Sequence, residues 1–229
     1  MQLESVVVTI VVLLAMPVAA QVHGDVGVSK GPRRFLALGD SYTIGERVDS
    51  TARWPVQLAG MLRARGIELT DPEVVARTGW TTDELAAGIA VAAPAGPFAL
   101  VTLLIGVNNQ YRGRDAERYR AEFASLLAQA REFAGGDASR VVVLSIPDWG
   151  VTPFAAGRDR IKIHADIDRF NAINREETAR AGAGYVDVTP ISRESREGWT
   201  TADGLHPSGV QYKRWAELAL DATVVALRR

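Results

Sequence analysis

Residues 33–41 read Arg-Arg-Phe-Leu-Ala-Leu-Gly-Asp-Ser, a short apolar run that stops at small and polar residues. A continuous apolar run of this length predicts a strand with both faces buried, over residues 33–39. Four further runs predict strands along the chain, although the first of them is less apolar. They cover residues 73–76, 98–105, 140–146 and 185–188.

Helical patterns lie between the predicted strands. Trp54, Leu58, Met61 and Leu62 fall on one face of a helix that we expect to end at Gly66. The same apolar spacing predicts further helices around residues 82–89, 119–130, 163–174 and 215–222. Strands that alternate with helices favour an α/β fold, here a three-layer sandwich around a parallel sheet of about five strands.

The composition is that of an ordinary globular protein. The chain has 229 residues, a length that suits one domain or two small ones. Of these residues, 47% are hydrophobic and 23% are charged. The 26 basic residues are balanced by 27 acidic ones, so we expect no nucleic-acid partner. The absence of cysteine excludes a disulfide scaffold, a thiolate metal site and a cysteine nucleophile.

The first residues have the pattern of an export signal. Residues 6–16 are apolar except for Thr9, and small residues follow, with Val18 and Ala20 at the positions that a signal peptidase reads. This pattern predicts a signal peptide over residues 1–20 and a secreted or periplasmic protein without a stable membrane span after cleavage.

One feature of this segment argues against cleavage. It carries Glu4 and no lysine or arginine, whereas the start of a signal peptide is usually basic, so a retained membrane anchor and a mispredicted start are the alternatives. Residues 21–32 are rich in glycine and polar side chains and are expected to form a lead-in segment. The domain is then predicted to span residues 33–229.

Polar residues follow three predicted strands at the point where each ends. Gly39-Asp40-Ser41 follows the first strand, Thr78-Gly79 the second and Gly106-Val107-Asn108 the third. The carboxyl ends of parallel strands gather at one edge of a sheet, which is where ligands bind in such folds. The segment Asp203-Gly204-Leu205-His206 precedes the last predicted helix and is able to reach the same edge.

These residue types are the parts of an acyl-transfer site. The Ser41 hydroxyl is a weak nucleophile that needs a base, and His206 is a suitable one. Asp203 lies three residues earlier and can hold the second imidazole nitrogen. The oxyanion formed on attack needs donors, for which the candidates are the amides of Ser41 and Gly79 and the side chain of Asn108.

Taken together, these four segments resemble the four sequence blocks of the SGNH (GDSL-type) hydrolase family, in the order that the family has them. The resemblance extends from Phe35 nearly to the end of the chain. It implies a flavodoxin-like α/β/α fold and a serine ester hydrolase that uses no metal and no cofactor. By the same match it implies a triad of Ser41, Asp203 and His206, with Ser41, Gly79 and Asn108 forming the oxyanion hole.

Two positions depart from the family pattern. Tyr42 follows the motif serine, where leucine is usual, and Asn109 stands where the third block usually has aspartate. The asparagine of the oxyanion hole is kept. We therefore expect that Asn109, if it has an effect, changes the contacts that support its loop and leaves the catalytic chemistry unchanged.

Other functions fit the sequence less well. The motifs Gly-x-Gly-x-x-Gly, Gly-x-x-x-x-Gly-Lys-Ser/Thr and Gly-x-Ser-x-Gly are absent, which disfavours a nucleotide-binding domain and an α/β-hydrolase. Asp40 is expected to hold the turn after the first strand, and His164 to be a surface or boundary residue. Trp149 is expected either to line the acyl pocket or to pack in the core.

The expected partner is a small-molecule ester, and the sequence leaves the oligomeric state open. No large apolar insertion is visible, which favours an esterase for small or soluble substrates over a long-chain lipase. The alternatives within the family are a carbohydrate acetylesterase, a lysophospholipase and a thioesterase. A relative that binds a carbohydrate or a lipid without catalysis is the alternative from another functional class.

Overall fold

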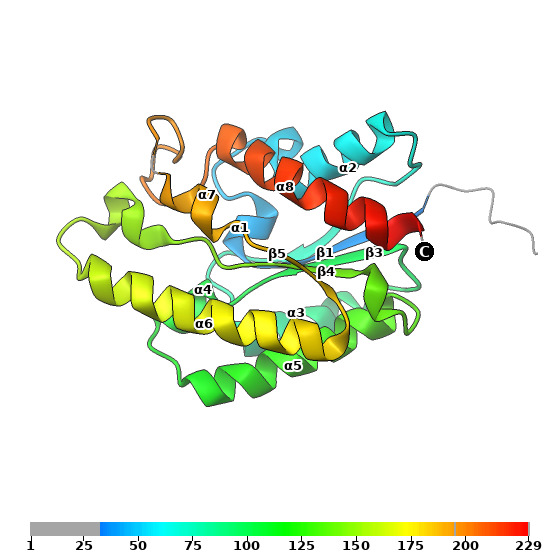
Figure 1. Cartoon of the computed structure of the whole chain (residues 1–229), viewed down its shortest axis with the longest axis horizontal. Coiled ribbons are helices and arrows are strands. Elements are labelled where there is room, and N and C mark those ends of the chain that lie inside the picture. The colour runs from blue at the N-terminus through cyan, green and yellow to red at the C-terminus, as the bar shows by residue number, and fades with distance from the viewer. Residues whose placement is uncertain (1–32, 195, 229) are drawn as a thin grey trace, which may run out of the picture. The chain divides into compact units, whose positions relative to one another are not determined.

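A parallel sheet of five strands, in the order β2-β1-β3-β4-β5, forms the centre of the molecule (Figure 1). The computed structural model describes residues 33–194 and 196–228. The strands are β1 (Phe35–Gly39), β2 (Glu73–Ala76), β3 (Leu100–Leu104), β4 (Val141–Leu144) and β5 (Gly184–Val186). This arrangement confirms the predicted α/β sandwich and its five parallel strands.

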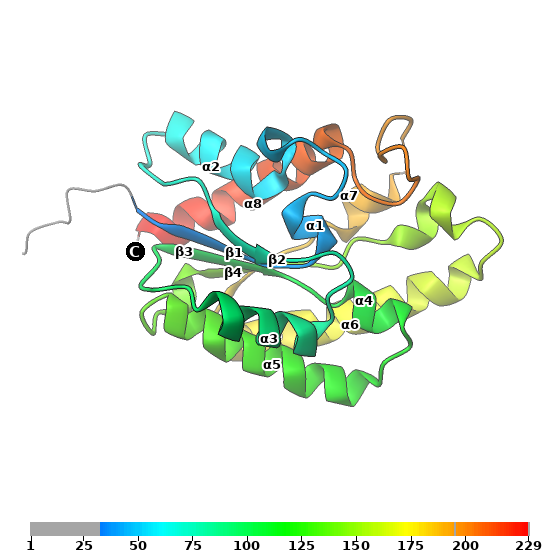
Figure 2. The same cartoon turned by 180° about the vertical axis from the view of Figure 1, so that it is seen from behind.

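Helices cover both faces of the sheet, as Figures 1 and 2 show from opposite sides. One face carries α2 (Trp54–Ala64) and α8 (Gly209–Arg228). The other carries α3 (Thr82–Ala92), α5 (Ala116–Phe133) and α6 (Arg160–Ala181). Short helices and 3₁₀ turns lie in the connections: α1 (Ser41–Ile44), α4 (Val107–Tyr111), α7 (Thr189–Arg193), η1 (Ser50–Ala52), η2 (Ala138–Arg140), η3 (Trp149–Val151) and η4 (Pro153–Ala155).

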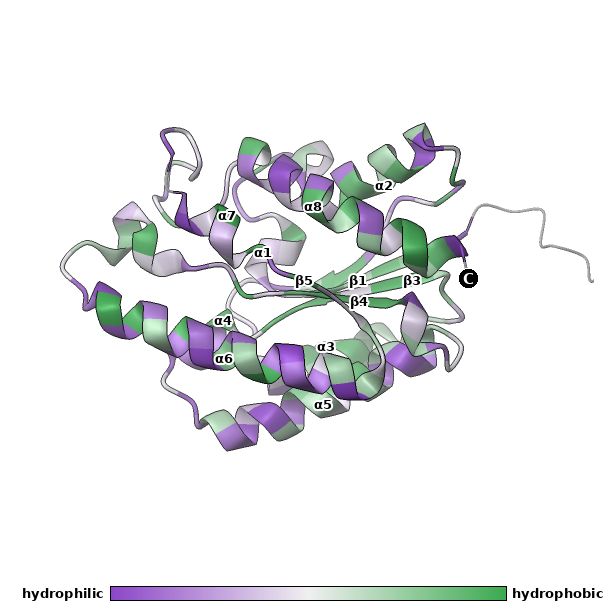
Figure 3. Cartoon of the chain, viewed as in Figure 1, coloured by the Kyte–Doolittle hydropathy of each residue, from purple (hydrophilic) through white to green (hydrophobic). Residues whose placement is uncertain are grey.

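The apolar runs of the sequence form the core because the helices cover both sides of the strands. Every residue of β1 and β3 is buried, and Figure 3 shows apolar strands between helices that carry both polar and apolar residues. Trp54 of α2 and Trp215 of α8 are fully buried on one side, and Phe123 of α5 on the other. Burial of side chains of this size stabilises the fold by about 1.5–3 kcal/mol each.

The register of the sheet brings three strand ends to one level. Gly39 of β1 pairs with Ala76 of β2 on one side and with Leu104 of β3 on the other. The chain passes from β1 to β2 in one direction and then returns past β1 to β3, so the winding reverses between β1 and β3. Open α/β sheets bind their ligands at such a reversal, outside the carboxyl ends of the strands.

The structure differs from the sequence predictions mainly in its short helices. α1, α4 and α7 have four or five residues each, too few to show an apolar period, and were not predicted. α3 continues to Ala92, beyond the predicted end at residue 89, because Ala90 and Ala92 favour a helix. Thr81 begins this helix in a capping box with Glu84.

The predicted signal peptide and lead-in segment, residues 1–32, lie outside the described residues. The proposed boundary between them therefore stays a prediction. Among residues 33–194 and 196–228, no helix has both the length and the hydropathy that a bilayer crossing requires.

Gly39 is expected to be indispensable for the turn into α1. A Cβ atom at this position would overlap the Thr43 side chain and the backbone carbonyl of Leu104, and overpacking of this kind costs about 1–3 kcal/mol. We predict that Gly39→Ala lowers the free energy of unfolding by at least about 1 kcal/mol, measured by urea denaturation.

Gly60 in α2 offers a matched control for this prediction. A Cβ there would meet no atom within 4 Å, so Gly60→Ala is expected to raise the free energy of unfolding. The gain is about 0.5–1 kcal/mol, because alanine loses less backbone entropy in a helix than glycine. Equal shifts of the two variants in the same direction would contradict the packing described at Gly39.

Candidate active site

Ser41 begins α1 immediately beyond the end of β1. Asp40 is the N-cap of this helix, and its Oδ1 accepts a hydrogen bond of 3.0 Å from the Tyr42 amide. The side-chain cap fixes the sharp change from strand to helix and so fixes where Ser41 lies. The role expected for Asp40 in the turn is therefore what the structure shows.

The Asp40 carboxyl is fully buried. Its Oδ2 makes no hydrogen bond with any described residue. Burial disfavours the charged form and outweighs the hydrogen bond from the Tyr42 amide, which raises the pKa of Asp40 to about 7. Near neutral pH a substantial share of this carboxyl is therefore protonated.

Asp203 and His206 lie on a tight loop closed by an antiparallel bridge between Thr200 and Pro207. Asp203 Oδ2 lies 2.6 Å from His206 Nδ1. Its Oδ1 accepts hydrogen bonds from the amides of Leu205 and His206, at 2.9 and 3.0 Å, and from Thr201 Oγ1 at 2.9 Å.

This set of hydrogen bonds keeps Asp203 charged. Burial alone would raise its pKa, but the bonds from His206, Leu205 and Thr201 outweigh burial and hold the pKa well below its usual range. The carboxylate therefore favours a proton on Nδ1 of His206. The other ring nitrogen, Nε2, is then left as the acceptor.

Gly79 occupies a hydrogen-bonded turn directly after β2. The Trp80 amide donates to the Arg77 carbonyl at 3.2 Å, which places Gly79 at the third position of the turn with φ of +86°. A type II turn needs a positive φ at this position. Arg112 donates to the Gly79 carbonyl at 2.6 Å and thereby connects the turn to the residue that follows α4.

Asn108 on α4 is tied to the same turn. Its Nδ2 donates a hydrogen bond of 2.9 Å to the Trp80 carbonyl, which engages one of the two hydrogens on that nitrogen. The neighbouring Asn109 is buried and accepts from the Thr82 amide at 3.1 Å while donating to Thr82 Oγ1 at 2.7 Å. The loop thus keeps firm support although asparagine replaces the usual aspartate.

A cavity of about 180 Å³ joins these segments. Its wall includes Ser41, Gly79, Asn108 and His206, and Asp203 lies behind His206. The structure thus brings together all five residues that the sequence predicts for the triad and the oxyanion hole. The remaining lining residues are mostly apolar: Tyr42, Thr78, Val107, Tyr111, Trp149, Phe154 and Leu205.

Tyr42, the second departure from the family pattern, packs between the site and the core. Its ring lies 5.8 Å from the His206 ring and 6.0 Å from the Trp215 ring, both edge to face. Tyr42 is buried, so it supports the imidazole from one side and links α1 to α8. A leucine has no ring edge to offer at this position.

Three aromatic residues of the cavity wall come from connecting segments. Trp149 lines the cavity, one of the two roles considered for it, and its Nε1 donates to Gln110 Oε1 at 2.8 Å. Tyr111 and Phe154 were not singled out in the sequence, because nothing in their local pattern distinguishes them from other loop or helix residues.

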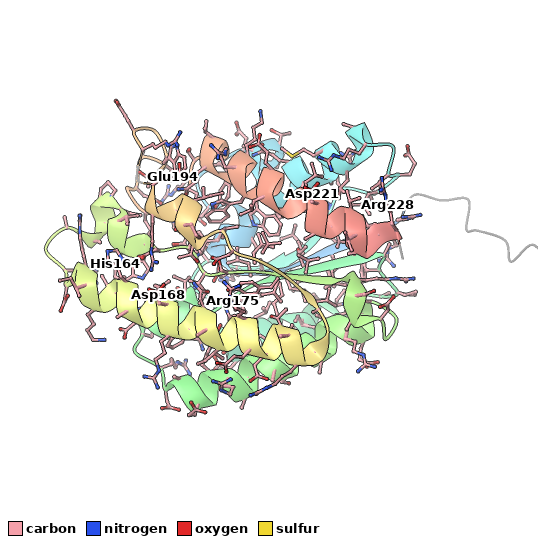
Figure 4. The ribbon with its side chains drawn as sticks, in the orientation of Figure 1. His164, Asp168, Arg175, Glu194, Asp221 and Arg228 are labelled. Atoms are coloured by element: carbon pink, nitrogen blue, oxygen red, sulfur yellow. The ribbon has the colours of Figure 1, made fainter. Side chains whose placement is uncertain are left out.

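His164 has a partner that the sequence did not reveal. This residue of α6, labelled in Figure 4, was expected at the surface or its boundary, and its side chain is 36% exposed. Its Nδ1 lies 2.5 Å from Oδ2 of the buried Asp148, which also accepts from Arg193 Nε at 2.8 Å. Asp148 precedes Trp149, so this network anchors one wall of the cavity.

No group of three or more metal-ligating His, Asp or Glu side chains occurs within residues 33–194 and 196–228. The site described above consists of a hydroxyl, an imidazole, a carboxylate and amide donors. These are groups that support nucleophilic acyl transfer.

Residues 37–214 match the family model of the GDSL-like lipases and acylhydrolases. The chain belongs to this family. It is therefore a carboxylic ester hydrolase. The cavity that Ser41 and His206 both line, with Asp203 paired to His206, also indicates this activity. The resemblance to SGNH hydrolases inferred from the sequence is confirmed.

Solved structures show the same fold. The crystal structure of TesA has 21% sequence identity and a TM-score of 0.65, and the match covers 83% of this chain and 97% of that one. The psychrotrophic esterase EstA from Pseudoalteromonas sp. has 15% identity and a TM-score of 0.62, with 86% and 100% covered. An acetyl-xylooligosaccharide esterase from Geobacillus has 17% identity and a TM-score of 0.65, with 84% and 94% covered. No curated protein matches the sequence.

The buried Asp40 gives the fold a specific pH dependence. Its pKa is raised from 3.8 to about 7, so the folded protein retains a proton that the unfolded chain has lost in this interval. The stabilisation is complete below pH 4 and declines as the pH rises to about 7, by up to roughly 4 kcal/mol. We predict that Asp40→Asn abolishes this decline and is more stable than wild type at pH 8.

Urea unfolding of both proteins between pH 4.5 and 8 measures this effect. Asp221→Asn serves as the control, since Asp221 is an exposed carboxylate on α8 (Figure 4) and should leave the pH slope unchanged. Identical pH slopes in wild type and Asp40→Asn would show that Asp40 does not carry the effect.

Proposed function

We propose that the protein hydrolyses carboxylic esters of small or soluble substrates through an acyl-enzyme formed on Ser41. One observation carries this proposal: Ser41 and His206 line the same cavity, and the Asp203 carboxylate holds the far nitrogen of His206 at 2.6 Å. This pairing leaves Nε2 of His206 to serve the hydroxyl of Ser41.

The reaction then takes two similar steps. Nε2 of His206 takes the proton of the Ser41 hydroxyl as Oγ attacks the ester carbonyl carbon. The tetrahedral species collapses, the bond to the alcohol breaks, and His206 returns the proton to the departing oxygen. Water, activated by the same nitrogen, attacks the acyl-enzyme and releases the acid and the free serine.

The proposed oxyanion hole consists of the amides of Ser41 and Gly79 and of Asn108 Nδ2. The Ser41 amide lies at the start of α1, and the Gly79 amide in the turn that Arg112 and Asn108 hold. Because these contacts fix the donors before the substrate arrives, little reorganisation is needed as charge develops.

The size of the cavity supports small acyl groups. Its volume is about 180 Å³, and an apolar cavity of about 150 Å³ is enough to hold benzene. An acyl chain of up to about six carbons therefore fits, and a longer chain has to extend outside. A carbohydrate acetylesterase is a second candidate, because the exposed rings of Tyr111 and Phe154 beside the cavity suit stacking against a sugar.

We also propose that residues 1–20 are an export signal and that the mature protein, secreted or periplasmic, begins at Gln21. The apolar stretch at 6–16 and the small residues before position 21 support this proposal. Intact mass measurement of protein expressed from the full sequence tests it. A mass that includes residues 1–20, in a protein recovered with the membrane, would favour the retained anchor.

The catalytic proposal predicts the loss of ester hydrolysis in one variant. Hydrolysis of 4-nitrophenyl esters from acetate to palmitate is measured with the wild type and with Ser41→Ala. We expect kcat to fall at least about 10³-fold in Ser41→Ala, and wild-type kcat/KM to decline for chains beyond about six carbons.

Ser50→Ala is the matched control, since Ser50 lies on an exposed turn outside the cavity and should keep wild-type rates. Hydrolysis that persists in Ser41→Ala would rule out Ser41 as the nucleophile. If the wild type is inactive on every ester, including an acetylated xylooligosaccharide, the binding-only relative is the better reading.

A further inference from the structure

One wall of the Ser41 cavity is an aromatic wall made of Tyr111, Trp149 and Phe154. The Trp149 ring lies 5.4 Å from that of Tyr111 and 6.0 Å from that of Phe154, and the last two are 6.3 Å apart. Tyr111 is 46% exposed and Phe154 is 38% exposed. Rings that remain accessible beside a catalytic cavity are a surface for a ligand.

Arg158 lies against all three rings. Its guanidinium carbon is 5.3, 5.4 and 4.9 Å from the ring centres of Tyr111, Trp149 and Phe154. Its NH2 group donates to the Tyr111 hydroxyl at 3.2 Å. The stacking and the hydrogen bond hold the cation against the aromatic wall, in a neighbouring hollow that Asp159, Lys162 and Asp166 also line.

Among the residues that the structure describes, Arg158 lacks the carboxylate partner that its counterparts have. Four arginines of the described residues lie over aromatic rings, and three of them also pair with a carboxylate. Those pairs are Arg34 with Glu73, Arg175 with Asp187 and Arg196 with Glu194. Arg158 forms no ion pair with any carboxylate in the part of the chain that the structure describes.

The neighbouring carboxylate is engaged elsewhere. Asp159, next to Arg158 in sequence, caps α6 by accepting from the Lys162 amide at 2.9 Å. Lys162 in turn pairs with Asp166 at 2.5 Å. Within residues 33–194 and 196–228 the Arg158 guanidinium thus makes no ion pair, although Asp159 and Asp166 line the same hollow.

We propose that Arg158 and the aromatic wall bind an anionic group of the substrate. The inference rests on the proposed function and names its substrate class: an ester that carries a carboxylate or a phosphate and extends from Ser41 along Tyr111 and Trp149, which line both the cavity and the hollow of Arg158. The flat fork of a guanidinium matches both anions, and the rings below it pack against the apolar part that connects anion and ester.

The anion can lie on either side of the ester bond, and the two cases are separable. On the alcohol side, the matched pair is 4-acetoxybenzoate and its methyl ester. On the acyl side, it is the mono-4-nitrophenyl ester of terephthalic acid and its methyl ester. The two members of each pair differ by one negative charge and one methyl group, and the rigid ring prevents the carboxylate from attacking its own ester.

The measured quantity is the ratio of kcat/KM for the anionic ester to that for the neutral ester. We expect Arg158→Met to lower this ratio about fivefold in at least one pair, the effect of losing about 1 kcal/mol from a partly exposed ion pair. The neutral esters should keep their rates. Added salt should lower the ratio of the wild type toward that of the variant.

Two further variants make the test decisive. Arg158→Gln removes the charge but keeps a donor for Tyr111, so it should reproduce the lowered ratio even if Arg158→Met folds poorly. Arg175→Met removes a ring-stacked cation of α6 that does not line the cavity, and should leave the ratio unchanged (Figure 4). An unchanged ratio in both Arg158 variants, for both pairs, overturns the proposal.

Failure of the proposed function has a different signature. If Ser41→Ala still hydrolysed the neutral esters, the acyl-enzyme mechanism would be wrong, whatever the ratio in the Arg158 variants. If Ser41→Ala is inactive while both Arg158 variants keep the wild-type ratio, the esterase stands and only the anionic substrate class is rejected.

Discussion

The hydrogen-bonded register of β1 with β2 and β3 is the constraint on which the site depends. It ends three strands at one level, with Gly39 between Ala76 and Leu104, so each strand delivers its next residues to the same edge. Ser41, Gly79 and Asn108 follow those ends by at most four residues, so each of them must lie close to the end of its strand. Because Gly39 has no Cβ, α1 can approach the end of β3 closely enough for this arrangement to form.

Short polar contacts then hold the converging segments together. Arg112 and Asn108 both hydrogen-bond to carbonyls of the turn at Gly79, so the turn and α4 keep one geometry. Asn109 extends this support by donating to the Thr82 hydroxyl, which is free to give its own proton to Glu122. An aspartate in place of Asn109 would compete with Glu122 for that proton, which gives a physical reason for the departure from the family pattern.

The sequence was informative wherever one local signal decides the structure. Continuous apolar runs identified the strands, and the residues just after them included Ser41, Gly79 and Asn108. The short helices α1 and α4 were missed because their conformation depends on caps and on packing against the sheet. Phe154 and Arg158 were missed for a related reason, since tertiary contacts place them. The hydrogen bond from the Phe154 amide to the Gly204 carbonyl holds Phe154 at the cavity, and Arg158 packs against the ring of Phe154.

The most direct measurement is a crystal structure of the protein after reaction with an alkyl phosphonate, a mimic of the tetrahedral species. The proposed mechanism requires phosphorus bonded to Ser41 Oγ. It also requires one phosphonate oxygen within about 3 Å of the amides of Ser41 and Gly79 and of Asn108 Nδ2, with His206 Nε2 facing Oγ. An adduct on another residue, or a phosphonate oxygen turned away from these donors, would contradict it.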